Sequence, residues 1–387
     1  MQDNDQLSSV VRLAFRLGCT AFGGPAAHIA MLRDEAVERR KWLSDQHFLD
    51  LIGLTNLIPG PNSTEMVMHV GHERAGWRGL VGAGTAFILP AAAITLAFSW
   101  AYVEYGATAP GEWILRGIKP VVLAVIVQAI WGLGRTAIKG PWFAAVGALI
   151  VALYLLGINE IALLFGGAAL AAGGQWLMST WQARGSGTSA SSLLLLGLPG
   201  LLPATQAVAD PTVSYSLGRM FLAFLKIGSV LYGSGYVLLA FLQNEFVDDL
   251  GWLTEQQLLD AVAIGQVTPG PVFTTATFVG YIAGGFPGAV VATLAIFIPA
   301  FLFVGLLRPV LPRLQAIPWV RPLLDDVNIA AIGLMVAVSV LLTADAVVDV
   351  MTAVIAVVAF VLLVRFRVNS AVLIVAGAVV GGLSTLI

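Results

Sequence analysis

Long apolar stretches alternate with short polar segments along this chain, and the alternation continues from one end to the other. Apolar runs occupy residues 79–100, 161–177, 290–307 and 350–364, among others. Several of them approach the ~20 residues that a membrane-spanning helix needs. No separate hydrophilic domain interrupts the series. The pattern predicts an all-α integral membrane protein whose helices cross the bilayer several times.

In the first half of the chain, the pattern predicts five crossings and one interruption. The expected crossings cover residues 8–32, 77–103, 113–134, 141–157 and 159–182. Two shorter segments, 45–58 and 62–74, lie between the first two crossings and are separated by Pro59-Gly60-Pro61. Each falls short of the ~20 residues that span a bilayer. Because irregular backbone at membrane depth is tolerated where protein surrounds it, we expect a re-entrant hairpin here.

The chain matches itself when it is displaced by about 210 residues. We interpret residues 1–184 and 215–387 as two copies of one repeat. A Ser-, Gly- and Pro-rich linker at 185–214 joins them. The matching motifs are Gly18 with Gly228, Trp42-Leu43-Ser44 with Trp252-Leu253-Thr254, and Pro59-Gly60-Pro61 with Pro269-Gly270-Pro271.

The basic residues predict that the two copies have opposite orientations. An odd number of crossings per copy would turn the second copy over, and basic residues collect on the cytoplasmic side. The basic stretch 33–41 is replaced at the equivalent place by the acidic stretch 245–249. With the N-terminus outside, most of the 20 basic residues fall in the cytoplasm. We expect two inverted-topology repeats, with a substrate site near the midplane between them.

Composition agrees with a membrane protein and excludes several other classes. Hydrophobic residues make up 58% of the 387 positions and charged residues 11%, and the mean hydropathy is +0.89. A single cysteine, Cys19, leaves no disulfide framework. The net charge of −2 and the absence of a basic stripe give no sign of nucleic-acid binding. The N-terminus lacks a basic segment, so we expect no cleaved signal peptide and a multi-pass protein of the inner (plasma) membrane.

Two cations occupy equivalent positions inside the first crossing of each half. A charge such as Arg16 or Lys226 at that depth costs at least ~2.5 kcal/mol unless it faces a wet cavity or a counter-ion. The pair therefore predicts an anion site. Snorkelling toward a helix end is the alternative, especially for Arg16, because Arg12 lies one turn nearer the surface. Glycine-rich breaks follow both cations and contribute Gly23, Gly24 and Gly233 to the predicted site.

Each Pro-Gly-Pro break should leave backbone N–H groups free where a helix restarts, which favours anion binding. Glu65 has two interpretations. It completes a capping box with Asn62, or it is a coupling or gating group that only the first half contains. The side chains near the two restarts that we predict to bind substrate are Asn62, Ser63, Thr64, Thr274 and Thr275.

A metal site is a minor alternative at the same place. Glu65, His69 and His72 share a helical face through their spacing of four and three. The second half has Val279 and Ile282 at the positions of the two histidines, so a polar rim is the preferred interpretation. We expect no metal and no cofactor, and we interpret His28 as a structural residue.

Four motifs carry a family resemblance. Residues 22–28, 56–65 and 74–79 resemble the first half of long-chain chromate ion transporters, and residues 266–277 resemble their second half. The resemblance implies an antiparallel two-domain carrier that lowers cytoplasmic chromate, with sulfate as a competing ligand. The one departure is Ser234-Gly235, where a plainer glycine run is expected.

The resemblance thus implies a secondary transporter that exports chromate or a related tetrahedral oxyanion, driven by the membrane potential, a proton gradient or both. An oxyanion channel or an importer is the alternative. The sequence has no phosphate-binding loop, nucleophile elbow or zinc-helix motif, so we expect no enzyme. The expected partners are the oxyanion and the lipid bilayer, and both a monomer and a homodimer remain open.

Overall fold

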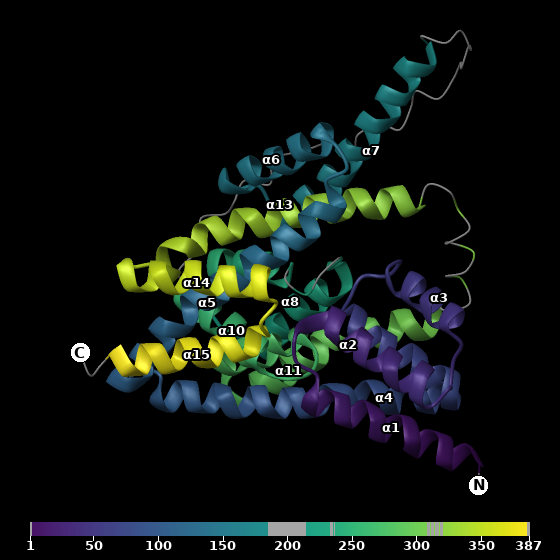
Figure 1. Ribbon diagram of the computed structural model, residues 1–387, viewed down its shortest axis with the longest axis horizontal. Coiled ribbons are helices and arrows are strands. Elements are labelled where there is room, and N and C mark those ends of the chain that lie inside the picture. Colours follow the sequence, from purple (N-terminus) through teal and green to yellow (C-terminus); the bar gives the residue numbers. More distant parts are fainter. Residues whose placement is uncertain are drawn as a thin grey trace.

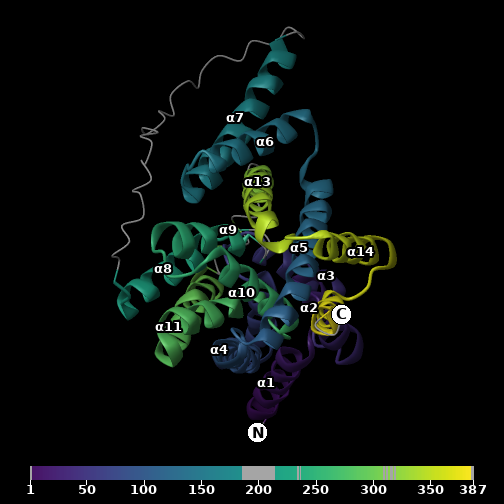
Figure 2. The ribbon, with the colours of Figure 1, turned by 90° about the vertical axis from the view of Figure 1, so that its left-hand side faces the viewer.

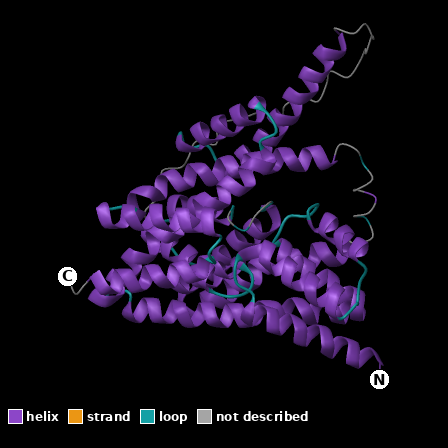
Figure 3. Cartoon of the chain, viewed as in Figure 1, coloured by secondary structure: helices purple, strands orange, loops and turns teal. Residues whose placement is uncertain are grey.

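The computed structural model describes residues 2–184, 214–232, 237–307 and 320–384, together with positions 235, 310, 313 and 317. All regular elements in these ranges are helical, and none is a strand (Figure 3). The expected linker lies outside the described residues, apart from Ser214. The predicted all-α class is confirmed.

The order of helices in the first half recurs in the second. The first half contains α1 (Gln2–Thr20), α2 (Gly24–Arg33), η1 (Asp34–Arg39), α3 (Asp45–Thr55), α4 (Asn62–Tyr105), α5 (Ala109–Ala137), α6 (Pro141–Leu155) and α7 (Glu160–Arg184). The second half contains α8 (Leu217–Val230), α9 (Leu238–Leu242), η2 (Gln243–Asp249), α10 (Glu255–Val267), η3 (Val272–Thr274), α11 (Thr275–Leu307), α13 (Val320–Ala346), α14 (Val350–Phe366) and α15 (Ser370–Leu383). The helices α3, α6 and α7 begin about 210 residues before α10, α14 and α15.

The first expected crossing, 8–32, is divided into two helices. Gly23 and Gly24 have φ angles of 101° and 76°, a left-handed backbone that ends α1 and lets α2 start in a new direction. The chain then reverses direction, which brings Glu35 within 2.5 Å of Arg16. A straight helix rising ~1.5 Å per residue would separate these two residues by roughly 28 Å.

Helix α4 consists of two arms, 62–74 and 77–105, that meet at a sharp turn. Ala75 and Gly76 leave helical geometry, and Gly76 has a φ of 56°. The backbones of Gly71 and Gly79 touch so closely that a side chain on either would collide with the other arm. Helix α11 repeats this turn at Gly284 and Gly285. The predicted separation of a short segment from the following crossing is therefore present in both halves.

The two halves exchange packing partners. Helix α5 packs against α14 and α15 of the second half, and α13 packs against α6 and α7 of the first half (Figure 1 and Figure 2). In addition, α4 packs along α11. The hydrophobic core therefore runs through both halves rather than lying separately in each.

Helices α5 and α13 occupy corresponding places in the two halves and run antiparallel to each other. Lys139, just beyond the end of α5, lies 2.5 Å from Asp325 near the start of α13. At the opposite ends, Arg116 of α5 pairs with Asp349, just beyond α13. The two ion pairs therefore join both ends of the antiparallel pair.

Among the described residues, five helical segments are long and apolar enough to cross a membrane, by length and composition. Much of the surface is apolar as well. Leu156, Val350 and Phe366 are 78%, 80% and 65% exposed. Exposing so large an apolar surface to water is unfavourable, and burial in lipid removes this cost. The five segments are Asn62–Tyr105, Gly111–Arg135, Glu160–Leu177, Val272–Leu307 and Pro322–Ala346.

Candidate substrate site

The tip of each Pro-Gly-Pro break is hydrogen-bonded to the helix break of the other half. The Gly60 N–H donates to the Leu231 carbonyl at 2.9 Å, and the Gly270 N–H donates to the Ala21 carbonyl, also at 2.9 Å. Gly60 corresponds to Gly270, and Ala21 corresponds to Leu231. The same hydrogen bond is therefore formed twice. In one the first half donates to the second, and in the other the second half donates to the first.

Both tip residues have to be glycine. Gly60 and Gly270 have φ angles of 140° and 88°, in the left-handed region that other residues rarely adopt. A Cβ on Gly60 would strike the carboxylate of Glu65, and one on Gly270 would lie 2.8 Å from the Ala91 side chain. The chain therefore uses glycine here both for its backbone angle and for close approach.

Glu65 is buried beside the first break, and neither of its carboxylate oxygens has a hydrogen-bond partner among the described residues. The capping-box interpretation is wrong, because Pro61 occupies the cap position and Asn62 donates to Asn56 instead, at 2.9 Å. Tyr232 of the second half lies within electrostatic range of Glu65. A buried carboxylate in this state has a high free energy when ionised.

His28 connects the first helix break to the start of α4. With its Nε2 protonated, it donates to the Ala21 carbonyl at 3.0 Å, and its Nδ1 accepts from the Ser63 hydroxyl at 3.3 Å. The Ala21 carbonyl therefore accepts from both His28 and Gly270. Both ring nitrogens have partners, as expected of a structural histidine.

Threonine hydroxyls line the contact between the second break and α4. We call Thr95, Thr268 and Thr274 the threonine seam. The hydroxyls of Thr274 and Thr275 donate to the carbonyls of Pro271 and Val272, at 2.8 Å each. Thr95, on the long arm of α4, donates to the Thr274 hydroxyl at 3.3 Å and lies 3.5 Å from that of Thr268. Thr64 is fully buried, and its hydroxyl has no partner among the described residues.

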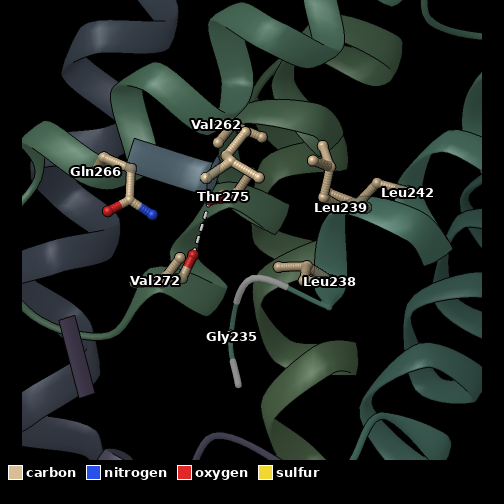
Figure 4. A pocket seen from close by; sticks show the side chains of 9 residues that line it. Gly235, Leu238, Leu239, Leu242, Val262, Gln266, Val272 and Thr275 are labelled. Atoms are coloured by element: carbon tan, nitrogen blue, oxygen red, sulfur yellow. Dashed lines mark hydrogen bonds between the residues drawn. The ribbon is translucent and has the colours of Figure 1, made fainter. Parts of the chain in front are cut away.

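The space at the second break is small. A cavity of about 10 Å³ lies among Gly235, Leu238, Val262, Gln266 and Thr275 (Figure 4). Such a volume holds at most one water molecule. A tetrahedral oxyanion does not fit in this volume.

The two predicted cations each have a carboxylate partner in their own half. Arg16 lies 2.5 Å from Glu35, and Lys226 pairs with Glu245. Their side chains are 51% and 37% exposed, so neither is deeply buried. The structure supplies the counter-ion that such a charge requires and does not bring the two cations together as a bare pair.

The carboxyl group of Glu35 is strongly stabilised in its ionised form. Burial opposes ionisation, but hydrogen bonds from Arg16 and Arg40 outweigh it and hold the pKa of Glu35 below its usual range. Gly23 and Gly24 form the turn that brings Glu35 to Arg16. Gly233, the remaining glycine of the predicted site, lies outside the described residues.

The minor metal interpretation finds no support in the side-chain arrangement. Glu65 and His69 are fully buried, whereas the ring of His72 lies edge-on to that of Trp77, with 6.0 Å between centroids. In the part of the chain that the structure describes, no group of three or more His, Cys, Asp or Glu side chains is placed to hold a metal ion.

Several buried acidic side chains were not predicted, and Asp260 is one of them. Asp260 is 1% exposed, accepts a hydrogen bond from the Tyr102 hydroxyl at 2.9 Å, and lies 3.6 Å from the Lys119 ammonium group. The sequence did contain a signal, since a lysine inside an apolar crossing requires a partner. The identity of that partner depended on contacts between the two halves.

A duplicated, all-helical, multi-pass membrane protein with broken helices facing each other across the two halves has the architecture of a solute transporter. More particularly, the chain belongs to the chromate transporter family. The family model, described as "Chromate transporter", matches residues 8–172 and again residues 218–382. Members of this family are transporters and not enzymes.

Similar proteins match over most of the chain. A chromate transport protein of Cupriavidus metallidurans is 32% identical over 380 residues, covering 97% of this chain and 92% of its own. A probable chromate transport protein of Synechococcus elongatus is 31% identical and covers 84% and 82%, respectively. A chromate transport protein of Pseudomonas aeruginosa is 32% identical and covers 84% and 78%. No solved structure matches this chain.

Proposed function

We propose that this protein is a secondary transporter that exports chromate, or a related tetrahedral oxyanion such as sulfate, across the inner membrane. The names of its relatives support the solute. The observation that carries the mechanism is the reciprocal contact of the two breaks, Gly60 with Leu231 and Gly270 with Ala21. Two halves that meet through equivalent broken helices can rock against each other and expose the contact first to one side and then to the other.

The two halves have opposite orientations in the bilayer. Support comes from the antiparallel α5 and α13, both of which contain candidate membrane-spanning segments. The charge pattern agrees, because the basic stretch 33–41 and the acidic stretch 245–249 occupy equivalent places. With the basic stretch in the cytoplasm, the acidic stretch faces outward.

The substrate binds between the breaks once the halves separate. Opening parts Thr95 from Thr274, and the hydroxyls of Ser63, Thr64, Thr274 and Thr275, together with the amides that follow Pro61 and Pro271, then become donors for the oxyanion. Asn62 stands at the same helix start and offers an amide group. These are neutral donors, so charge neutralisation must come from other side chains.

Arg16 and Lys226 supply that neutralisation by exchanging partners. A tetrahedral dianion offers the same charge-assisted hydrogen bonds as a carboxylate, so it can replace Glu35 at Arg16 and Glu245 at Lys226. The left-handed glycines Gly23 and Gly24 give the first break the freedom to move. Gly233 is the sequence counterpart of Gly23 in the second half, and we assign it to the site on that ground.

Glu65 is the coupling or gating group. Ionised, it would repel an incoming dianion at the first break, and protonated, it would not. The second half has Thr275 at this place, so the control is present on one side only.

The membrane potential is sufficient to drive export. A dianion that leaves an inside-negative cell gains about 4.6 kcal/mol per 100 mV, twice the single-charge value. At ~1.4 kcal/mol per tenfold, this supports a gradient of roughly a thousandfold without ATP.

The test is uptake of labelled chromate into inside-out vesicles, in which cellular export becomes uptake. We expect saturable uptake that sulfate inhibits and that falls when the potential is collapsed. Vesicles without the protein are the control. Uptake equal to that control would refute the proposal, and flux that never saturates would indicate a channel instead.

A further inference from the structure

Asp260 joins the hairpin of the second half to two helices of the first half. It lies on α10 and is 1% exposed, while its partners are Tyr102 on the long arm of α4 and Lys119 on α5. The Lys119 side chain is only 12% exposed. Breaking a buried ion pair by removing one partner is strongly destabilising, because it leaves an uncompensated charge in a low-dielectric interior.

This cluster adjoins the moving part of the proposed site. Helix α10 leads directly into Pro269-Gly270-Pro271, and the Gly270 N–H bonds to the first half. Thr95 and Tyr102 lie two turns apart on one face of α4, so the same face holds the second hairpin at the threonine seam and at Asp260. Release of Asp260 would therefore loosen the whole hairpin.

Among the described residues, the first hairpin has no matching cluster. Asp50, the counterpart of Asp260, is exposed and accepts a hydrogen bond from Gln46 at 3.0 Å. Helix α13, the counterpart of α5, contains no lysine. A contact needed only to hold the two halves together would have no reason to be confined to one hairpin.

Few other titratable groups face Asp260. Lys119 comes from α5 and Tyr102 from α4, whereas α9, α15 and η3, which also pack on α10, carry no titratable side chain. On η2, Glu245 pairs with Lys226, and Asp248 and Asp249 accept from Gln243 and Asn244. On α13, Asp325 pairs with Lys139, Asp326 accepts from Gln175, and Asp345 acts on Glu255, at the start of α10. On α11, the titratable side chain is Tyr281. The charge state of Asp260 therefore decides whether Lys119 is held.

We propose that Asp260, Lys119 and Tyr102 form a proton-operated latch, in which a proton taken up by the Asp260 carboxylate releases Lys119 and frees the second Pro-Gly-Pro break. This latch rests on the proposed function. It gives the protein a second protonation site in addition to Glu65, on the opposite hairpin. One proton enters Asp260 from outside when the hairpin opens and leaves to the cytoplasm when it closes, while the oxyanion moves outward. Oxyanion movement is thereby coupled to proton movement.

The first experiment compares the pH dependence of chromate uptake in proteoliposomes. The variants are Asp260→Asn, Lys119→Gln and the double variant, in which no uncompensated buried charge remains. The matched control is Arg116→Gln with Asp349→Asn, a second ion pair that links α5 to the other half but is partly exposed. We expect wild type and control to share one pH profile, changing up to about tenfold per pH unit for each titrating carboxyl. The double variant should fold and show a weaker dependence, carried by Glu65 alone. If it kept the wild-type profile, the latch would be refuted and the cluster would be structural.

A second measurement does not require transport. Cysteine at position 268, in a Cys19→Ser background, reports on the seam because Thr268 is 4% exposed when the hairpin is closed. Thiol labelling should increase on acidification with Asp260 present and stay constant in Asp260→Asn. Equal labelling of both at every pH would overturn the latch. Absence of chromate uptake by the wild type, with pH-dependent labelling intact, would instead refute only the proposed substrate.

Discussion

The carboxylate of Glu35 lies 2.5 Å from the guanidinium of Arg16, and about 210 residues later Glu245 pairs with Lys226 in the same way. The duplication therefore preserved the pairing although the cation changed from arginine to lysine. In each half, the break at the end of the first helix makes the pairing possible. This places both cations where a competing anion can reach them, since neither is fully buried.

Neutralising Arg16 and Lys226 together should abolish chromate export while leaving the protein folded. Glu35 keeps its hydrogen bonds from Arg39 and Arg40, and a glutamine at either position can still donate to the carboxylate, so Arg16→Gln with Lys226→Gln should still yield folded protein. Uptake into inside-out vesicles measures the effect. The contrasting variant is Glu35→Gln, which frees Arg16 and should retain or increase chromate affinity. Unchanged uptake by the double variant would remove both cations from the site.

The Glu65→Gln variant should transport chromate with a weaker response to the pH gradient, because Asp260 alone then carries that response. The substitution keeps the side-chain volume and removes a charge that has no hydrogen-bond partner among the described residues, so thermal stability should stay the same or rise. Uptake is measured with the potential and the pH gradient collapsed separately. Glu73→Gln, on the same arm of α4 but near His47, is the control and should behave as wild type. A response to the pH gradient equal to that of the wild type would exclude Glu65 as a coupling group.

Alanine at Gly60 or Gly270 should destabilise the protein by ~1–3 kcal/mol, the cost of forcing another residue into a left-handed backbone. Steric collision with Glu65 or Ala91 adds to that cost. Thermal unfolding in detergent measures the loss. Gly132→Ala is the matched control, because nothing lies within 4 Å of the added carbon, and a helical alanine should be neutral or stabilising. Equal melting temperatures for all three variants would contradict the tight contact between the halves.

Cysteines introduced at Arg39 and Asp248 should be labelled from opposite sides of the membrane. Both positions are exposed, and both variants are made in a Cys19→Ser background. An impermeant thiol reagent on intact cells should label the cysteine at position 248, and the one at position 39 only after permeabilisation. Labelling of both from one side would exclude the inverted orientation and, with it, the alternating-access mechanism.

Much of the secondary structure could be predicted from the sequence, because its causes are local. The Pro59-Gly60-Pro61 break and the start of the long arm of α4 near Trp77 follow from proline, glycine and apolar runs. The first crossing was the main difference. Residues 8–32 contain enough apolar side chains for one helix, but two successive left-handed glycines divide it, and glycine alone does not reveal its φ angle.

Partners were harder to predict than positions. Arg16 and Lys226 stood out because a charge in an apolar segment is costly, yet their carboxylates lie 19 residues away, where only the reversal of the chain brings them close. Asp260 carried no such signal, because the short helix α10 has polar residues elsewhere. Its partners lie on α4 and α5 of the other half.

The sequence by itself determined that this chain is helical, duplicated and embedded in a membrane. Apolar content and helix breakers act on neighbouring residues, and the duplication is visible in the order of the repeated motifs. Only the tertiary structure decided that Gly60 meets Leu231, that Gly270 meets Ala21, and that Asp260 is held by Lys119. These contacts join residues more than 100 positions apart. Their formation depends on the angles at a few glycine turns and on how the two halves pack, and neither is encoded in any single segment.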